Sequence, residues 1–231
     1  MEAEFVSKSG VGISIDSARL SDAVLHVTVR ATSLIDHVVL HSLGALHGRR
    51  DGSTLFRLRD QDGQSFVEVA WHERSDGRAD NAEHAHAEFR GVSQNARRYQ
   101  LEIPFACVDD LRGELAIDLP VQKPLSAVLG RNAVRVLSSQ VSHVPDGATP
   151  GPALAFDLDL GEWHDDWRVI KPYCAEVDGA PAPIVWESLG TEPTPSAFIR
   201  VRSDRAGDAR RVTLRGATVQ VRGPWILSFN V

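Results

Sequence analysis

Three histidines in two neighbouring segments of the sequence could together bind a transition metal. In the segment EHAHAEFR, His84 and His86 alternate with apolar residues, and His72 ends a similar alternation in the preceding segment FVEVAWHE. Side chains at positions i and i+2 of a β-strand share a face, so His84 and His86 point away from the core. A hairpin with its turn near Arg78 would place His72 opposite His84. Three imidazoles on one face predict a Zn²⁺ site, and a polar outer sheet face without metal is the alternative.

A second cluster, in the segment GEWHDDW, could bind carbohydrate. Two tryptophans flank a histidine and two acids in a predicted loop: Trp163, His164, Asp165, Asp166 and Trp167. Indole rings can stack on sugars while polar neighbours bind the hydroxyls, which predicts a carbohydrate-binding platform. A Ca²⁺ site would need more oxygen ligands than these two carboxylates supply. The alternative is that the tryptophans close the edge of a β-sandwich.

A third group of histidines, His37, His41 and His47, lies in or beside the segment LIDHVVLHSLGAL. The apolar spacing of this segment fits one helix, and two strands separated at Gly44 fit equally well. His37 and His41 would share a helix face, but no Glu follows the first His as a metalloprotease motif requires. We interpret these histidines as packing residues. No other catalytic motif occurs, so we expect no enzyme; a metal-dependent hydrolase built on the predicted zinc site is the alternative.

Alternating apolar residues predict that most of the chain forms β-strands. Alternation with a period of two buries one face of a strand and leaves the other face polar. Asp-Gly pairs, which are typical of hairpin turns, separate several of these runs. The clearest alternating runs are at residues 11–15, 25–29, 154–160 and 225–231. We expect an all-β fold of antiparallel β-sandwiches.

Two short motifs occur twice in the sequence, which predicts a duplicated domain. ARRYQL is matched by ARRVTL in the second half, and LRGELAIDLPV is matched by the C-terminal VRGPWILSFNV. The connection between the motifs is shorter in the second copy, as expected of a duplication in which loops tolerate deletion. We therefore expect two tandem β-sandwiches, at residues 1–122 and 133–231, joined by a linker at 123–132. Residues 115–121 and 225–231 would be the equivalent last strands.

Composition and charge exclude several classes of partner. The formal net charge is −6 and arginines occur singly or in pairs, so we expect no nucleic-acid binding. No apolar run is long enough to span a membrane. The N-terminus lacks the apolar region of a secretory signal, which predicts a cytoplasmic location, or an extracytoplasmic one if a leader has been removed. Two cysteines, Cys107 and Cys174, fall one in each half and exclude a disulfide framework within either half.

The repeated strand endings, above all VRGPWILSFNV after the hairpin turn at Asp178-Gly179, resemble those of bacterial immunoglobulin-like modules. They are similar to the extracytoplasmic sandwich domains of some anti-sigma factors, although this chain has neither the sigma-binding helices nor the transmembrane helix of that family. The resemblance implies two tandem immunoglobulin-like sandwiches with a binding or structural role. We therefore predict a non-catalytic protein that recognises a protein partner through sandwich loops or edge strands. Carbohydrate binding is the alternative within the same class.

Overall fold

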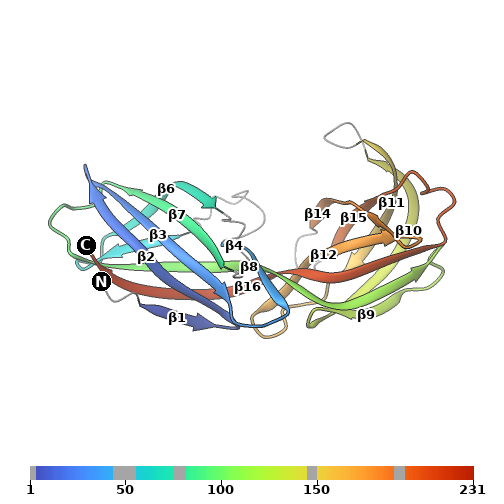
Figure 1. The fold of residues 1–231 in the computed structure, drawn as a ribbon, viewed down its shortest axis with the longest axis horizontal. Coiled ribbons are helices and arrows are strands. Elements are labelled where there is room, and N and C mark those ends of the chain that lie inside the picture. Colours follow the sequence, from blue (N-terminus) through green and yellow to red (C-terminus); the bar gives the residue numbers. More distant parts are fainter. Residues whose placement is uncertain (1–3, 44–55, 75–81, 145–149, 190–195) are drawn as a thin grey trace. The chain divides into compact units, whose positions relative to one another are not determined.

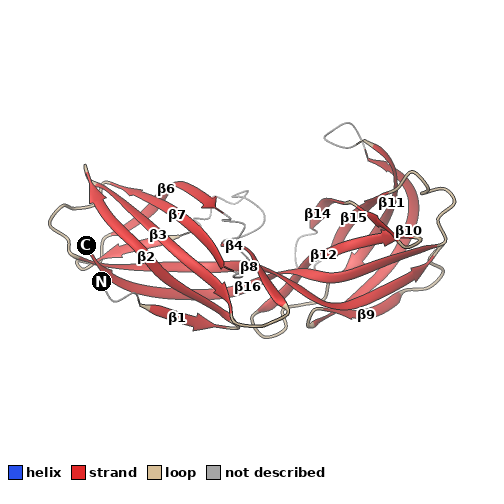
Figure 2. Cartoon of the chain, viewed as in Figure 1, coloured by secondary structure: helices blue, strands red, loops and turns tan. Residues whose placement is uncertain are grey.

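The computed structural model describes residues 4–43, 56–74, 82–144, 150–189 and 196–231. Regular secondary structure in these residues consists of β-strands, in three antiparallel sheets of four, seven and five strands (Figure 2). The first two sheets are linked by strand pairing into 11 strands, ten in one continuous order and one paired beside it. The prediction of an all-β antiparallel fold is therefore confirmed. No helix in the described ranges is long and apolar enough to cross a membrane.

The strands group into two compact units. Unit 1 comprises Met1–Val108 and Gln220–Val231, and unit 2 comprises Asp109–Val219. Each unit has its own buried apolar core, built mainly from apolar residues that alternate with more exposed ones along the strands. Two long strands, β8 (Arg98–Asp118) and β16 (Arg211–Asn230), contribute residues to both units (Figure 1).

In unit 1, five strands pair in the order β1-β2-β3-β7-β6, and the order continues through β5 to β8 and β16, with β4 also pairing with β8. The strands of this unit other than β8 and β16 are β1 (Phe5–Lys8), β2 (Val11–Ser21), β3 (Val24–Ser33), β4 (Val38–Leu43), β5 (Arg57–Asp60), β6 (Ser65–Arg74) and β7 (Ala82–Arg90). Trp225 of β16 is fully buried in this core, and its indole N–H donates a hydrogen bond of 3.1 Å to the carbonyl oxygen of Val11.

In unit 2, five strands pair in the order β14-β15-β11-β10-β9, and a second layer contains β12 and β13 beside β16 and β8. The strands of this unit other than β8 and β16 are β9 (Leu125–Leu129), β10 (Asn132–Val144), β11 (Gly151–Asp159), β12 (Trp167–Val177), β13 (Ala180–Ala182), β14 (Ile184–Leu189) and β15 (Ser196–Arg202). The orders β1-β2-β3-β7-β6 and β9-β10-β11-β15-β14 correspond strand for strand. This correspondence supports the predicted duplication.

The two compact units do not divide the chain at residues 123–132, as the sequence predicted. Instead, β8 begins in unit 1 and ends in unit 2, whereas β16 begins in unit 2 and ends in unit 1. The two strands are antiparallel neighbours: the Val231 N–H donates to the Arg97 carbonyl oxygen in unit 1, and the Leu119 N–H donates to that of Arg210 in unit 2. The end of β8 is therefore part of unit 2 and the end of β16 part of unit 1. Both strands greatly exceed the usual five or six residues, which lets each of them serve two cores.

The repeated Ala-Arg-Arg sequence marks the same backbone capping arrangement in both units. In unit 1, the side-chain oxygen of Gln61 accepts hydrogen bonds from the N–H groups of Arg97 and Arg98, at 3.2 and 3.3 Å. In unit 2, Oδ1 of Asp178 accepts from the N–H groups of Arg210 and Arg211, at 3.1 and 2.9 Å. A hairpin turn thus supplies the acceptor for the start of the long strand each time.

The helix considered for residues 34–46 is not formed. β4 occupies Val38–Leu43, and Val38 and Leu40 are buried in alternation with more exposed neighbours, as in a strand. His41 lies on this strand and His37 in the turn before it, while Gly44 and His47 lie outside the described residues. The two cysteines are free, with Cys107 buried in unit 1 and Cys174 half-buried in unit 2, as the sequence predicted.

Candidate functional site

The predicted outward histidines of β7 lie on the solvent-facing side of unit 1. Ala85, Ala87 and Phe89 are buried, whereas His84 and His86 between them are half-exposed. The expected pairing of His72 with His84 is wrong: the backbone of His72 pairs with His86. The β6–β7 register contains an irregularity between Glu68 and Ala70 that the sequence did not indicate. The side chain of His72 lies outside the described residues, so the predicted three-histidine zinc site stays a prediction.

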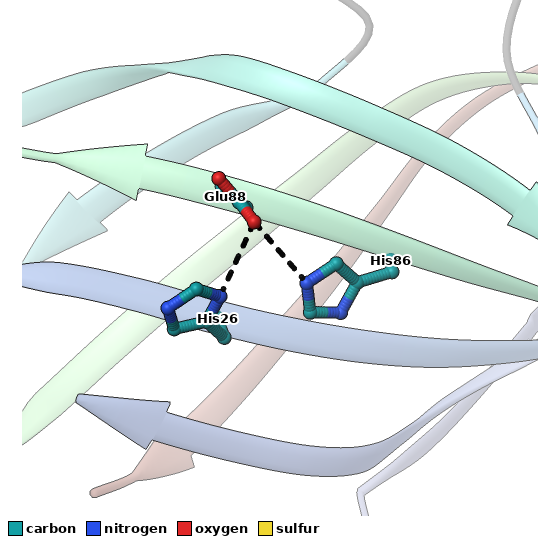
Figure 3. A group of neighbouring side chains, drawn as sticks. All are labelled: His26, His86 and Glu88. Carbon is teal, nitrogen blue, oxygen red and sulfur yellow. Dashed lines mark ion pairs between the residues drawn. The ribbon is translucent and has the colours of Figure 1, made fainter. Parts of the chain in front are cut away.

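Strand β3, on the other side of β7, brings a different histidine to the same face. His26 pairs with Glu88 in the β3–β7 register. Nδ1 of His26 lies 3.5 Å from Oε1 of Glu88, and Nε2 of His86 lies 3.8 Å from the same oxygen (Figure 3). The two imidazole rings stack, with centroids 5.5 Å apart and planes inclined by 20°. We call His26, His86 and Glu88 the histidine cluster; their ligand atoms all lie within 4.8 Å of one another.

Polar residues of β2 and β3 surround the histidine cluster. Thr28 Oγ1 lies 3.4 Å from Nδ1 of His86, the ring nitrogen that faces away from Glu88. His84 is drawn toward β2, where its Nδ1 lies 3.0 Å from Oδ2 of Asp16. Asp16 is the extra residue of a β-bulge between Ile15 and Ser17. A shallow groove of about 550 Å³ runs along this face, lined by Asp16, Ser17, Ala18, Arg19, Ser21, His26, Thr28 and His86.

Sequence reasoning missed His26 and Asp16 for different reasons. The outward direction of His26 follows from the alternation of β3, but its proximity to His86 depends on pairing between strands that are far apart in the sequence. Asp16 reaches this face because a bulge changes the alternation of β2, and bulges have no strong sequence signal here. The outward faces of His26 and His86 were therefore predictable, whereas the face of Asp16 and the neighbours of the histidines were not.

One of the two tryptophans of the predicted carbohydrate platform in unit 2 is buried in the core. Trp167 is only 2% exposed, and the guanidinium of Arg131 lies 4.5 Å from its ring centroid. The backbones of His164 and Trp167 exchange two hydrogen bonds, which close a tight turn over Asp165 and Asp166. Asp165 has a positive φ of 54°, as such turns require.

The remaining residues of this segment are more accessible. Trp163 is half-buried, with the guanidinium of Arg168 5.9 Å from its ring centroid. His164 and Asp165 are exposed and lie 3.4 Å apart as an ion pair, while Asp166 is half-buried. Only one indole of the predicted pair thus offers a surface for stacking.

Two exposed apolar side chains lie on the two strands that flank β16 in unit 2. Leu111 of β8 is 45% exposed and Tyr173 of β12 is 47% exposed. Between their strands runs β16, where a Cβ at Gly216 would lie 3.2 Å from both the Leu111 Cα and the Tyr173 Cβ. Leu111 and Tyr173 are therefore neighbours across a residue that has no side chain. We call Leu111, Tyr173 and Gly216 the apolar patch.

Charged residues of both signs border the apolar patch. Arg215 Nε lies 3.2 Å from a carboxylate oxygen of Glu114, and its Nη2 lies 3.4 Å from one of Glu176. Arg112 makes a two-pronged contact with the fully buried Asp110, at 3.0 and 2.8 Å, and this hydrogen bonding raises the pKa of the guanidinium. These ion pairs hold the charged groups in fixed positions around the two apolar side chains.

Another groove of unit 1 lies at the β5–β8 end. It measures about 630 Å³ and includes Asp60 and Tyr99. Oδ1 of Asp60 already accepts hydrogen bonds from the N–H groups of Asp62 and Gln64, which close the β5–β6 turn. Burial raises the pKa of Tyr99, and the charge of Asp60 raises it further. The acid of this groove has a structural role in the turn.

Comparisons with protein-family models, with curated proteins and with solved structures find no match to this chain.

Proposed function

We propose that this protein is a non-catalytic binding protein that recognises a protein partner through the apolar patch of unit 2. The observation that carries the proposal is the exposure of two large apolar side chains, Leu111 and Tyr173, side by side over Gly216. Tyrosine is enriched at the energetic centres of protein interfaces, where it combines large apolar area with one polar group. The proposed contact is therefore a sheet face, rather than the loops or edge strands that the sequence suggested.

Gly216 is buried and lets the strands of Leu111 and Tyr173 pack closely against β16. Its φ is +58°, a conformation that L-residues with side chains rarely adopt, and an added Cβ would lie 2.7 Å from the carbonyl oxygen of Asp110. The backbone here therefore favours glycine for a steric reason.

The border of the patch has the composition of an interface rim. Arg215 and its two carboxylate partners, Glu114 and Glu176, are partly solvent-accessible and already fixed by ion pairs. An ordered rim loses less side-chain entropy when a partner binds. Because both signs of charge are present, we expect the partner to present an apolar side chain surrounded by mixed charges.

The test compares variants of the full chain as affinity baits for soluble proteins, followed by binding measurements with the captured partner. We expect Tyr173→Ala and Leu111→Ala each to weaken binding by about 2 kcal/mol, roughly 30-fold. The matched control is Ile226→Ala, which removes an apolar side chain that is 42% exposed in unit 1. A partner that binds the double variant as tightly as the wild type would refute the assignment, and so would the absence of any partner.

We also propose that the two units are copies of one immunoglobulin-like module. The corresponding orders of five strands in each unit support this interpretation. Binding, rather than catalysis, is the usual work of such modules, although fold alone does not determine function.

A further inference from the structure

We infer that the histidine cluster of unit 1 is a binding site for a divalent transition metal, with His26, His86 and Glu88 as its ligands. This site lies in the other unit from the apolar patch, so the inference does not depend on the proposed function. Two imidazole nitrogens and one carboxylate oxygen are an established donor set for zinc. Imidazole ligands favour zinc and its first-row neighbours over Ca²⁺ and Mg²⁺, which take oxygen ligands.

The spacing of the ligand atoms is close to that of a tetrahedral metal site. With bonds of about 2.0–2.1 Å, adjacent ligands of a tetrahedral zinc ion lie about 3.3–3.4 Å apart. Oε1 of Glu88 lies 3.5 Å from Nδ1 of His26 and 3.8 Å from Nε2 of His86. These two distances exceed the tetrahedral spacing by a few tenths of an ångström, and the two imidazole nitrogens, which lie within 4.8 Å of each other, would have to approach by up to about 1.4 Å to enclose an ion. All three are half-exposed, which leaves the fourth position accessible to water.

Thr28 is placed to orient one of the ligands. Its hydroxyl oxygen lies 3.4 Å from Nδ1 of His86, while Nε2 of the same ring is directed at Glu88 (Figure 3). A neutral imidazole that donates from Nδ1 to Thr28 presents the lone pair of Nε2 to the site. Metal-binding histidines commonly have an outer partner of this kind on the second ring nitrogen.

The cluster belongs to unit 1 and is not a consequence of the shared strand order. β11 and β15 correspond in order to β3 and β7, and neither strand contains a histidine. The outer residues of β15 instead include Arg200, whose Nε lies 3.1 Å from Oγ of Ser142. Unit 1 thus has histidines on two strands whose counterparts in unit 2 have none, as expected of a site that is specific to unit 1.

Ion pairing between Glu88 and protonated histidines is the competing explanation for the same distances. Exposed pairs of this kind contribute little to stability and need no third group. His164 and Asp165 of unit 2 are such a pair, 3.4 Å apart and exposed. Among the described residues, they do not belong to a group of three side chains that could bind a metal. They provide a matched control within the same chain.

The experiment titrates the metal-free full chain with Co²⁺, whose visible absorption reports its coordination, and then displaces it with Zn²⁺. We expect one tight Co²⁺ per chain, lost in His26→Ala and His86→Ala and weakened at least tenfold in Glu88→Gln. Thr28→Val should weaken binding about tenfold, the usual effect of removing an outer partner. His164→Ala should bind Co²⁺ like the wild type. All these side chains face solvent at least in part, so the variants should fold, which thermal unfolding without metal will check.

Two results would overturn the assignment. One is a wild-type protein that binds no Co²⁺ or Zn²⁺ at concentrations up to about 100 μM, because three preplaced ligands should bind in that range. The other is binding that survives in His26→Ala but is lost in His84→Ala and His72→Ala, which would restore the three-histidine set predicted from the sequence. In our assignment His84 belongs to the Asp16 pair, so His84→Ala keeps the metal.

Discussion

Replacing Trp225 with alanine should destabilise unit 1, although this residue lies in the last strand of the second copy of the sequence repeat. Trp225 is fully buried, and its indole N–H donates to the carbonyl oxygen of Val11 at 3.1 Å. Removing a buried aromatic side chain costs about 3–5 kcal/mol through lost contacts and the cavity left behind. Leaving the Val11 carbonyl without its partner adds about 1 kcal/mol. We expect a total loss of about 4–6 kcal/mol in the free energy of unfolding.

Hydrogen exchange measured by mass spectrometry identifies the unit that loses stability. Peptides from β2 and β3 in unit 1 should exchange faster in Trp225→Ala, because Trp225 packs in their core. Peptides from β10 and β11 in unit 2 should change much less. Trp225→Phe is the matched control: it keeps most of the apolar volume and loses the hydrogen bond, so it should cost about 1–3 kcal/mol. Faster exchange confined to unit 2 would refute the exchange of strand ends between the units.

Two further substitutions test local features of the fold. Tyr99→Phe should reduce the loss of stability that occurs when the pH is raised. Burial and the charge of Asp60 raise the pKa of Tyr99 in the folded state, so the contribution of Tyr99 to stability is complete below about pH 10 and is lost as the pH rises through the folded pKa. Urea unfolding between pH 8 and 11.5 will measure this difference. Asp178→Ala should destabilise unit 2 by about 1–2 kcal/mol, because the N–H groups of Arg210 and Arg211 lose their acceptor. Asp178→Asn keeps an acceptor and tolerates the positive φ of 49°, so it should cost less than half as much; equal losses in calorimetry would contradict the capping role.

Local alternation in the sequence was sufficient to predict the faces of β3 and β7, but not of β6, where Val67 is 55% exposed although the alternation places it inward. In β7, Ala85, Ala87 and Phe89 are buried and the histidines between them face solvent, as predicted. When one face of a regular strand is buried, every second residue points inward, so a few neighbouring residues show which side chains face the core. The same local information was ambiguous for residues 34–46, where a helix and strands fitted equally well.

Pairing between distant strands could not be predicted from local patterns. His26 meets His86 because β3 pairs with β7, and nothing near either histidine specifies that partner. The repeated motifs indicated two similar strand endings but not which core each ending would enter. Because the two endings have the same apolar alternation, either unit could bury either one. Only the continuity of β8 and β16 through both units decides that each ending packs with the other half of the sequence.

Both proposed sites consist mainly of outward-facing residues, whose identity the packing of the core does not restrict. In both units the buried positions described in the five corresponding strands are mainly apolar, because each core must be packed. Outward positions carry no such constraint, and here unit 1 has His26 and His86 where β11 and β15 of unit 2 have none. The apolar patch likewise depends on outward residues, Leu111 and Tyr173, beside a glycine. The two proposals therefore assign a metal site to one unit and a protein-binding face to the other, and we expect substitutions at either site to leave the other unchanged.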